Sequence, residues 1–283
     1  MSQPFTVALI QNCAGPEVEA NIAETGAMTR EAADKGASLI VLPEYFSALA
    51  SDGPKLVMPA FAEEAHPALP AFSALARELD VWLLLGSLPI ETAGGKVNNR
   101  GYLIGPDGAV AQRYDKVHLF DVNLANGETY RESATIEPGC EAVLAELPWG
   151  RLGMTICYDL RFAQLYRSLA QAGADFLAVP AAFTKRTGEA HWHILNRARA
   201  IENGAFVFAP CQCGTHEGGG KTYGHSLIID PWGRILADGG EAPGIVLAEV
   251  DPAEVTKARS MIPSLQHDRP FTLTEASPLK AAE

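Results

Sequence analysis

Short apolar runs alternate with helical stretches along this chain, and hairpin signals interrupt the alternation. The runs typical of buried strands are residues 5–11, 38–44, 81–90, 175–181 and 205–210. The stretches typical of helices are residues 17–36, 67–79, 161–172 and 190–203. Pro-Asp-Gly and Pro-Trp-Gly turns predict hairpins at 101–116, 143–157 and 227–236. Because hairpins place antiparallel strands beside the parallel ones, we expect two mixed sheets packed together rather than one purely parallel sheet.

The fold expected from this pattern is an α/β sandwich of four layers, α-β-β-α, in which helices flank the two mixed sheets. The chain has 283 residues, a length that fits one large domain. No internal repeat, low-complexity tract or linker rich in Pro, Gly and Ser divides it. We therefore expect a single domain over residues 1–270, followed by a polar tail at 271–283.

The composition argues against several classes of protein. The chain has 22 Lys and Arg against 34 Asp and Glu, a net charge of −12. That balance disfavours nucleic acid and membrane surfaces as partners, since both attract basic proteins. No apolar run approaches the ~18 residues of a membrane span, and the N-terminal residues lack the basic start of a signal peptide. Five cysteines, an odd number, do not suggest a disulfide framework. The sequence therefore predicts a cytoplasmic protein with reduced thiols.

Cys157 stands at the exit of an apolar run, in the stretch GMTICYDLRF. Packing in a core is the common role of a cysteine, but such a residue more naturally sits inside the run. A strand that ends at Cys157, followed by a helix from about Arg161, would resemble a nucleophile elbow with free backbone N–H groups. Asp159 is well placed to cap that helix. The position therefore favours a nucleophilic role for Cys157.

A nucleophilic thiol needs a neighbouring group that activates it. Histidine is the usual choice, but none of the seven histidines ends a strand in the way expected of a site residue. Glu44 ends the apolar run 38–44, and Lys116 closes the second arm of the hairpin 101–116. Taken separately, Glu44 could be a solvated strand end and Lys116 an ordinary surface cation.

The order and separation of these motifs resemble the carbon–nitrogen hydrolase, or nitrilase, superfamily. The motifs that carry the three residues are LPEYF, YDKVHLFD and ICYDLRF. Further segments similar to the family are YRESATIEPG at 130–139, PAAFTKRTGEAHWHILNRARAIEN at 180–203 and YGHSLIIDPWGRIL at 223–236. The resemblance extends from about residue 5 to residue 270, and several motifs in the family's order are far more specific than one.

This resemblance implies a Glu-Lys-Cys triad that works without a cofactor. Cys157 would attack an amide carbonyl, and Glu44 would take the thiol proton and later activate water. The Lys116 ammonium and the backbone N–H of Tyr158 would hold the oxyanion, and Lys116 would also favour the thiolate. Glu132 matches the second glutamate of the family and would orient Lys116 or the bound amide. The alternative for Glu132 is a capping or surface glutamate in a loop.

Within the superfamily, the chain resembles the branch of deaminated glutathione amidases and ω-amidases. The stretch APCQCGTHEGGGKTYGHS is more similar to the former, which implies hydrolysis of deaminated glutathione to 2-oxoglutarate and cysteinylglycine. An ω-amidase acting on 2-oxoglutaramate or another small carboxylated amide is the alternative. Because these substrates carry carboxylates, we expect cations from Arg161, Lys185 and Arg186, and a hydrogen bond from Thr184. Arg161 could instead lock the turn after the nucleophile, and Thr184 could be a core hydroxyl.

Other classes of function fit the sequence less well. Cys211 and Cys213, with the scattered His216 and His225, have poor zinc spacing, so we expect no metal there. A non-catalytic scaffold or binding protein is disfavoured because an idle relative would be free to lose the residues of the triad. The apolar residues of the helix expected at 161–173, together with the family resemblance, predict a homodimer or a higher homo-oligomer.

Overall fold

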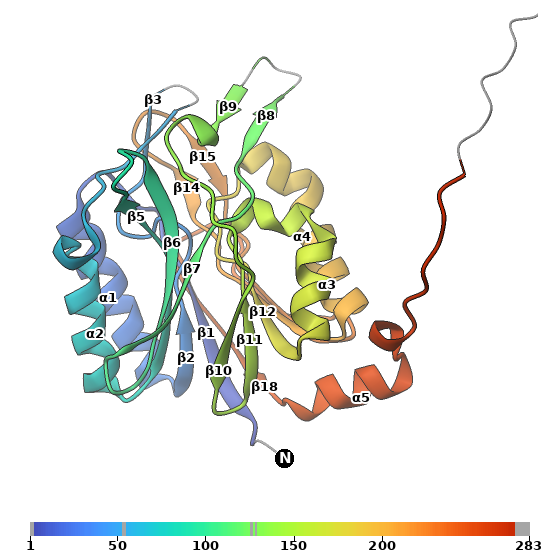
Figure 1. Ribbon diagram of the computed structural model, residues 1–283. Helices are drawn as coiled ribbons and strands as arrows, with labels where there is room; N and C mark the ends of the chain where they lie inside the picture. The colour runs from blue at the N-terminus through green and yellow to red at the C-terminus, as the bar shows by residue number, and fades with distance from the viewer. Residues whose placement is uncertain (1–2, 53–54, 125–126, 128, 275–283) are drawn as a thin grey trace, which may run out of the picture.

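Two six-stranded mixed sheets lie face to face, and helices cover the outer face of each sheet (Figure 1). The computed structural model describes residues 3–52, 55–124, 127 and 129–274. The arrangement confirms the four-layer α-β-β-α sandwich predicted from the sequence. In the predicted tail at 271–283, the described residues 271–274 are exposed, and the remainder lies outside the described residues.

The first sheet has the strand order β18-β1-β2-β5-β6-β7. Its strands are β1 (Phe5–Gln11), β2 (Ala37–Val41), β5 (Trp82–Glu91), β6 (Val97–Ile104), β7 (Val110–Asp115) and β18 (Gly244–Val250). β1, β2 and β5 run parallel, and the other neighbours pair antiparallel. β6 and β7 form the first of the hairpins predicted from the sequence.

The second sheet has the strand order β10-β11-β12-β13-β16-β17. Its strands are β10 (Val143–Leu147), β11 (Gly150–Met154), β12 (Ala174–Ala178), β13 (Phe206–Ala209), β16 (Leu227–Ile229) and β17 (Ile235–Asp238). β11, β12 and β13 run parallel, whereas β10 pairs antiparallel with β11, and β16 with both β13 and β17. The hairpins β10–β11 and β16–β17 are those predicted from the two Pro-Trp-Gly turns.

Helices form the two outer layers of the sandwich (Figure 1). They are α1 (Val18–Asp34) and α2 (Ala68–Leu79) on the first sheet, α3 (Ala163–Gln171) and α4 (Lys185–Asn203) on the second, and α5 (Ala253–Met261) after β18. α4 starts five residues before the predicted helix 190–203. Gly188, a weak helix former, made this first turn look like a loop. A side chain there would have its Cβ only 2.3 Å from the Tyr223 ring, so close packing explains the glycine.

Apolar side chains fill the spaces between the layers. The larger cluster of buried residues joins both sheets to α3 and α4, with Val7 and Leu9 of β1 and Phe176 of β12 among its members. A second cluster lies between the first sheet and the helices α1 and α2. Strands with both faces covered in this way read as continuous apolar runs, which is why the sequence marked them clearly.

Small hairpins gather at one end of the sandwich (Figure 1). They pair β3 (Ala50–Asp52) with β4 (Lys55–Val57), β8 (Asp121–Asn123) with β9 (Thr129–Arg131), and β14 (Cys213–Thr215) with β15 (Lys221–Tyr223). Four short 3₁₀-helices are also described: η1 (Glu63–Ala65), η2 (Glu132–Ala134), η3 (Cys157–Arg161) and η4 (Ser264–Gln266). These elements were not predicted, because segments of three to five residues carry too little periodicity to be detected.

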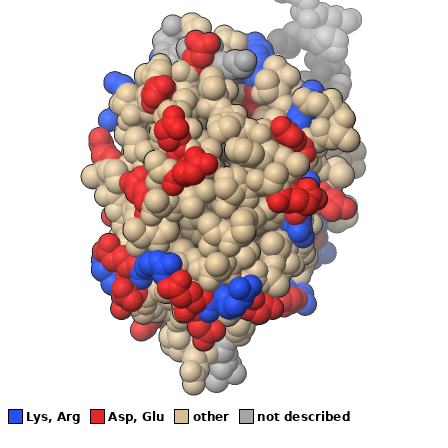
Figure 2. Space-filling view, turned by 90° about the vertical axis from the view of Figure 1, so that its left-hand side faces the viewer, with Lys and Arg blue, Asp and Glu red and all other residues tan. Residues whose placement is uncertain are grey.

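Acidic side chains are spread widely over the face that carries α1 and α2, whereas basic side chains on that face gather toward its lower end (Figure 2). This distribution agrees with the net charge of −12. None of the described helices is both long and apolar enough to cross a membrane.

Candidate active site

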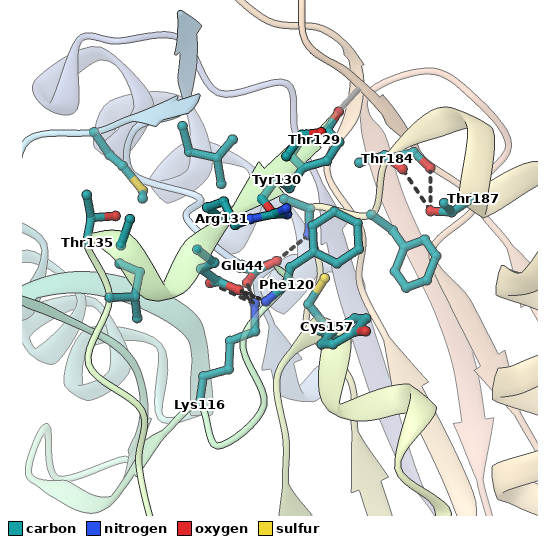
Figure 3. Close-up of a pocket in the computed structure, with 18 residues that line it drawn as sticks. Glu44, Lys116, Phe120, Thr129, Tyr130, Arg131, Thr135, Cys157, Thr184 and Thr187 are labelled. Atoms are coloured by element: carbon teal, nitrogen blue, oxygen red, sulfur yellow. Dashed lines mark hydrogen bonds and ion pairs between the residues drawn. The ribbon is translucent and has the colours of Figure 1, made fainter. Parts of the chain in front are cut away.

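A cavity of about 330 Å³ opens at the end of the sandwich where the small hairpins gather, and Figure 3 shows the side chains that line it. Glu44, Lys116, Glu132 and Cys157 are among them. These residues are up to 113 positions apart in sequence, and the structure brings all four to one cavity, as the triad hypothesis requires.

Each of these residues follows a strand. Lys116 comes directly after β7 and Glu132 directly after β9, while Glu44 and Cys157 each come three residues after the end of β2 and β11. The predicted strand 38–44 thus ends early, and Glu44 lies in a turn. Gly86 of β5 makes room for that turn, because a Cβ at this position would lie 2.1 Å from the Leu42 carbonyl oxygen.

Cys157 has a left-handed backbone conformation, with φ of +49°. Side chains other than glycine rarely adopt it, and such strained residues are enriched at functional sites. The Cys157 N–H donates to the Pro180 carbonyl at 2.9 Å, which fixes the turn. Cys157 is also the first residue of η3, and α3 starts only at Ala163. The strand-turn-helix transition expected at Cys157 is therefore present, with a 3₁₀ turn inserted.

Tyr158 lines the cavity and is the second residue of η3. The first N–H groups of a helix have no acceptor within that helix. The N–H of Tyr158 is therefore suited to donate to a group bound beside Cys157.

Asp159 does not cap α3, contrary to the prediction. The N-cap residue of α3 is Phe162, which makes no capping bond through its side chain. The fully buried Asp159 carboxylate instead accepts hydrogen bonds from the Ile156 N–H at 2.9 Å and from the Tyr114 hydroxyl at 2.7 Å. It also accepts from the backbone N–H of His118 at 3.0 Å, and the His118 Nδ1 lies 2.7 Å away.

Asp159 thus joins the turn that holds Cys157 to the segment that holds Lys116. Ile156 immediately precedes Cys157, and Tyr114 and His118 lie two residues on either side of Lys116. Because a buried carboxylate is costly unless it is hydrogen-bonded, this network strongly favours one relative position of the two segments.

Lys116 is buried between two carboxylates. Its Nζ lies 2.9 Å from Oε1 of Glu44, and 2.9 and 3.0 Å from the two carboxylate oxygens of Glu132. Burial alone would lower the pKa of Lys116, but the charges of Glu132 and Glu44 outweigh it and raise the pKa well above its usual value. Lys116 is therefore a permanent cation, and both carboxylates hold its ammonium in place.

Backbone and amide donors orient the two carboxylates. The Ala182 N–H donates to Glu44 Oε2 at 2.8 Å, and Asn99 Nδ2 donates to Glu44 Oε1 at 2.8 Å. The Phe120 N–H donates to Glu132 Oε2 at 2.6 Å. Burial raises the pKa of Glu132, the charge of Lys116 opposes that rise, and Glu44 adds to it. Glu132 thus lies in the buried site rather than on the surface.

The thiol of Cys157 is protonated at rest. Burial raises its pKa well above the usual value, the Glu44 carboxylate raises it further, and the Lys116 charge only partly opposes them. The sequence led us to expect that Lys116 would favour the thiolate. That expectation was incomplete, because two carboxylates share the cavity with one ammonium. Attack by Cys157 must therefore be coupled to removal of its proton by a base.

The walls of the cavity are largely apolar and aromatic. Phe120, Tyr130 and Arg131 line it (Figure 3). Tyr158 and Phe183 are also lining residues. The NH1 and NH2 atoms of Arg131 donate to the carbonyls of Val122 and Tyr130 and to Asn123 Oδ1. The sequence did not single out Arg131, although it immediately precedes Glu132 in the YRES motif.

The substrate-binding residues expected from the sequence lie in different places. Thr184 lines the cavity, and its Oγ1 is 2.7 Å from Thr187 Oγ1. The guanidinium carbon of Arg161 lies 5.8 Å from the ring centre of Tyr158 and 5.5 Å from that of Phe183, two cavity residues. Lys185 and Arg186 are not among the lining residues.

Lys185 instead pairs with Glu241 at 3.1 Å on the surface. The first turn of α4 carries Lys185 and Arg186 away from the cavity, because the residues that face it there are Thr184 and Thr187, three positions apart on the helix.

The thiols of Cys211 and Cys213 are buried, and burial raises the pKa of each to about 12. This agrees with the interpretation that these two cysteines pack in the interior.

Comparisons with known proteins point to one family. A sequence profile described as carbon-nitrogen hydrolase matches residues 6–260. A protein of Synechocystis sp. named deaminated glutathione amidase is 44% identical over 269 residues, which cover 94% of this chain and 98% of that protein. A Homo sapiens protein named omega-amidase is 35% identical over 266 residues, which cover 94% of this chain and 95% of that protein.

A solved structure also resembles this protein over most of its length. It is an amidase from Nesterenkonia sp. AN1, with a TM-score of 0.79 and 25% sequence identity, and the match covers 95% of each chain. That structure is of a Glu-to-Gln mutant, and it shows covalent addition of the acetamide moiety of fluoroacetamide at the active site cysteine.

Proposed function

The chain belongs to the carbon–nitrogen hydrolase family, and from that premise we propose that it hydrolyses deaminated glutathione to 2-oxoglutarate and cysteinylglycine through Cys157. Without regard to its specific substrate, the protein is a cysteine amidase of the nitrilase superfamily, which cleaves carbon–nitrogen bonds other than peptide bonds. The main observation in support of the proposal is that Cys157, Glu44 and Lys116 line the same cavity.

In the first half of the proposed reaction, Cys157 Sγ attacks the amide carbonyl while Glu44 takes the thiol proton. A base is needed because the raised pKa of Cys157 keeps the resting thiol neutral. The carbonyl carbon becomes tetrahedral and its oxygen becomes an oxyanion. Glu44 then passes the proton to the departing amine, the carbon–nitrogen bond breaks, cysteinylglycine leaves, and a thioester of 2-oxoglutarate stays on Cys157.

In the second half, Glu44 removes a proton from water, and the hydroxide attacks the thioester. The tetrahedral intermediate collapses, the carbon–sulfur bond breaks, and the thiolate of Cys157 recovers its proton from Glu44. 2-Oxoglutarate leaves and the starting state is restored. The fixed orientation of Glu44, held by Ala182 and Asn99, supports its use in both halves.

Lys116 and the backbone N–H of Tyr158 stabilise the oxyanion in both halves. A lysine ammonium has three N–H donors. At rest they face Glu44 Oε1 and the two carboxylate oxygens of Glu132, so the ammonium gives up one of its contacts with Glu132 when it donates to the oxyanion. Glu132 therefore acts by positioning Lys116, and its charge limits where the ammonium can move.

The likeness to the Synechocystis protein supports deaminated glutathione as the substrate, and the likeness to the human protein makes 2-oxoglutaramate the second candidate. Both substrates share the 2-oxo acid end, for which Arg161 and Thr184 are the proposed partners. Within the described part of the chain, Arg161 makes no ion pair with a carboxylate, and its guanidinium lies over two rings of the cavity wall. Its charge is thus available to a bound anion.

The test is a comparison of initial rates on the two substrates at equal enzyme concentration. The proposal expects a higher kcat/KM on deaminated glutathione, with formation of 2-oxoglutarate and cysteinylglycine. The Cys157→Ser variant is the control, and it should fold and be inactive on both substrates. A wild-type preference for 2-oxoglutaramate would replace the proposal with the ω-amidase function, and activity on neither would reject both substrates.

A second test concerns the cysteinylglycine carboxylate, which 2-oxoglutaramate lacks. Arg131 lines the cavity, so Arg131→Ala should lower kcat/KM on deaminated glutathione about tenfold or more, the loss of one charge-assisted contact. Its activity on 2-oxoglutaramate should change much less. The double variant Lys185→Ala/Arg186→Ala is the matched control, because it also removes cations near the site. If that double variant alone lost activity on deaminated glutathione, the distal cations would be those first expected from the sequence.

A further inference from the structure

Two histidines and one aspartate meet at a point outside the described cavity lining. They are His193 of α4, His225 between β15 and β16, and Asp238 at the end of β17. Their ligand atoms all lie within 4.8 Å of one another. His193 Nε2 is 3.0 Å from Asp238 Oδ2, and His225 Nδ1 is 2.8 Å from Asp238 Oδ1. Because the histidines are 45 and 13 residues from Asp238, sequence spacing gave no sign of the cluster.

The surroundings of the cluster hold each ring in position. The Tyr223 ring stacks on the His225 ring, with ring centres 4.6 Å apart and an angle of 28° between the planes. His193 packs edge-on against both of these rings. The Tyr223 hydroxyl lies 3.5 Å from His193 Nδ1, the nitrogen that faces away from Asp238. A partner on the far nitrogen of an imidazole is typical of histidines that bind metals.

The backbone at His225 is also constrained. Its φ is +51°, in the left-handed region. The N–H of His225 donates to the Gly240 carbonyl at 2.6 Å, and its own carbonyl accepts from Trp192 Nε1 at 2.8 Å. The strained backbone conformation is thus fixed from two sides, and it turns the imidazole toward Asp238.

We propose that His193, His225 and Asp238 bind a divalent transition-metal ion and that the ion fastens α4 to the β16–β17 hairpin. Two imidazole nitrogens and a carboxylate oxygen are a ligand set that zinc and neighbouring metals use. The side chains are between 21% and 34% exposed, which leaves room for water on the open side of the ion. The net charge of −12 favours attraction of a cation.

Asp238 is also held from its own loop. The Gly240 N–H donates to Asp238 Oδ1 at 2.9 Å, which fixes the carboxylate between the two histidines. In the absence of an ion, the same three side chains are joined by hydrogen bonds between the imidazoles and the carboxylate.

Calorimetric titration of the chelator-treated full-length protein with Zn²⁺ tests the proposal. The titration is done with the wild type and with Cys157→Ala, because the active-site thiol is a competing ligand. We expect one ion per chain at this site in both proteins. His193→Ala and Asp238→Asn should each weaken that binding at least about tenfold. His191→Ala is the matched control, since it removes a histidine two residues away on the same helix and should leave the affinity unchanged.

Absorption spectroscopy with Co²⁺ tests the proposal on the wild-type protein, so its result does not depend on whether a variant folds. Binding at this site should give visible absorption of a nitrogen and oxygen site, without the thiolate-to-metal charge-transfer band of a cysteine site. The melting temperature of the wild type should also rise with Zn²⁺ and fall back with chelator. Absence of binding, binding that survives both His193→Ala and Asp238→Asn, or a thiolate band as the only cobalt signal would each overturn the proposal.

Discussion

Glu44 and Lys116 share a hydrogen bond within the cavity, but their proposed tasks are different. Glu44→Gln keeps size and hydrogen bonding while removing the base, and Lys116→Met removes the cation while keeping most of the stem. Each should lower kcat at least ~10²-fold, the usual effect of losing a general base or an oxyanion donor. Steady-state kinetics of both variants, with circular dichroism as the folding control, measure this effect. A variant with nearly wild-type kcat would remove that residue from the triad.

The raised pKa of Cys157 gives a second prediction for Glu44→Gln. Burial and the Glu44 charge raise this pKa, so Glu44→Gln should lower it, because the second cause is removed. The thiolate should then form at a lower pH than in the wild type, although turnover is lost. The rate of fluoroacetamide labelling at Cys157, measured by mass spectrometry across pH, should show this downward shift. Cys140 is exposed and is an internal reference within each sample. An unchanged or higher pKa would contradict the assigned electrostatics.

At the level of single residues, the sequence marked the proposed nucleophile, base and cation because each stands at the end of a predicted strand. The end of a strand is a local feature, so it can be recognised from the sequence alone. The hydrogen bonds of Asp159 connect residues up to 45 positions apart, and only the fold brings them together. The expected capping role of Asp159 was wrong for this reason, and Arg131 was overlooked because it lies in β9, a strand of three residues that is too short to show periodicity.

The two segments that carry the site are joined by Asp159, which leads to a prediction at the level of elements. Asp159→Asn replaces an acceptor oxygen with a donor and leaves buried N–H or O–H groups without a partner. It should lower the free energy of unfolding by about 1–3 kcal/mol. It should also lower kcat, because Cys157 and Lys116 lose their common support. Urea unfolding and steady-state kinetics measure the two effects.

Asp230→Asn is the matched control for Asp159→Asn. Asp230 is another buried carboxylate, and it accepts bonds from the backbone of Trp232 and Arg234 in the β16–β17 turn. This variant should lose stability in a similar way while kcat changes little. If Asp159→Asn lost stability without any loss of kcat, its carboxylate would support the fold alone and would not position the catalytic residues.

The order of the elements was largely predictable, but their ends were not. Buried strands and amphipathic helices have clear periodicity, so the main strands and the three larger hairpins were found. The predicted helix 161–172 begins later, at Ala163, because η3 occupies the residues after the strand. The predicted helix 190–203 begins earlier, at Lys185, because tertiary packing against Tyr223 keeps Gly188 in the helix. Both differences arise from contacts between distant segments.

The two sheets share one pattern of strand pairing. Each has an antiparallel edge pair, then two parallel pairs, then two antiparallel pairs. The sequence shows no internal repeat, so this likeness of the two halves became visible only in three dimensions. Because β2 and β11 end at the same side of the sandwich, the turns that carry Glu44 and Cys157 lie opposite each other. The site therefore requires both sheets.

The homodimer is the remaining prediction for the whole molecule. The apolar surface that the structure offers for it lies on a different helix from the one expected from the sequence. Leu165, Tyr166 and Leu169 of α3 are buried within their own chain, so they leave little apolar surface for a neighbour. Ile194 and Ile201 of α4 are 69% and 54% exposed, and their spacing of seven places them on the same side of the helix. The predicted homodimer is therefore expected to bury this side of α4.

Light scattering at micromolar concentration should give a mass well above the 30.2 kDa of one chain. Ile194→Glu places a charge on the exposed side of α4, so it should weaken association at least about tenfold, since burying an unpaired charge is costly. Leu273→Glu is the control, because Leu273 is 80% exposed but lies in the predicted polar tail, near the end of the described chain. A wild-type mass near that of one chain would contradict the dimer. A dimer that is unaffected by Ile194→Glu would show instead that another surface mediates association.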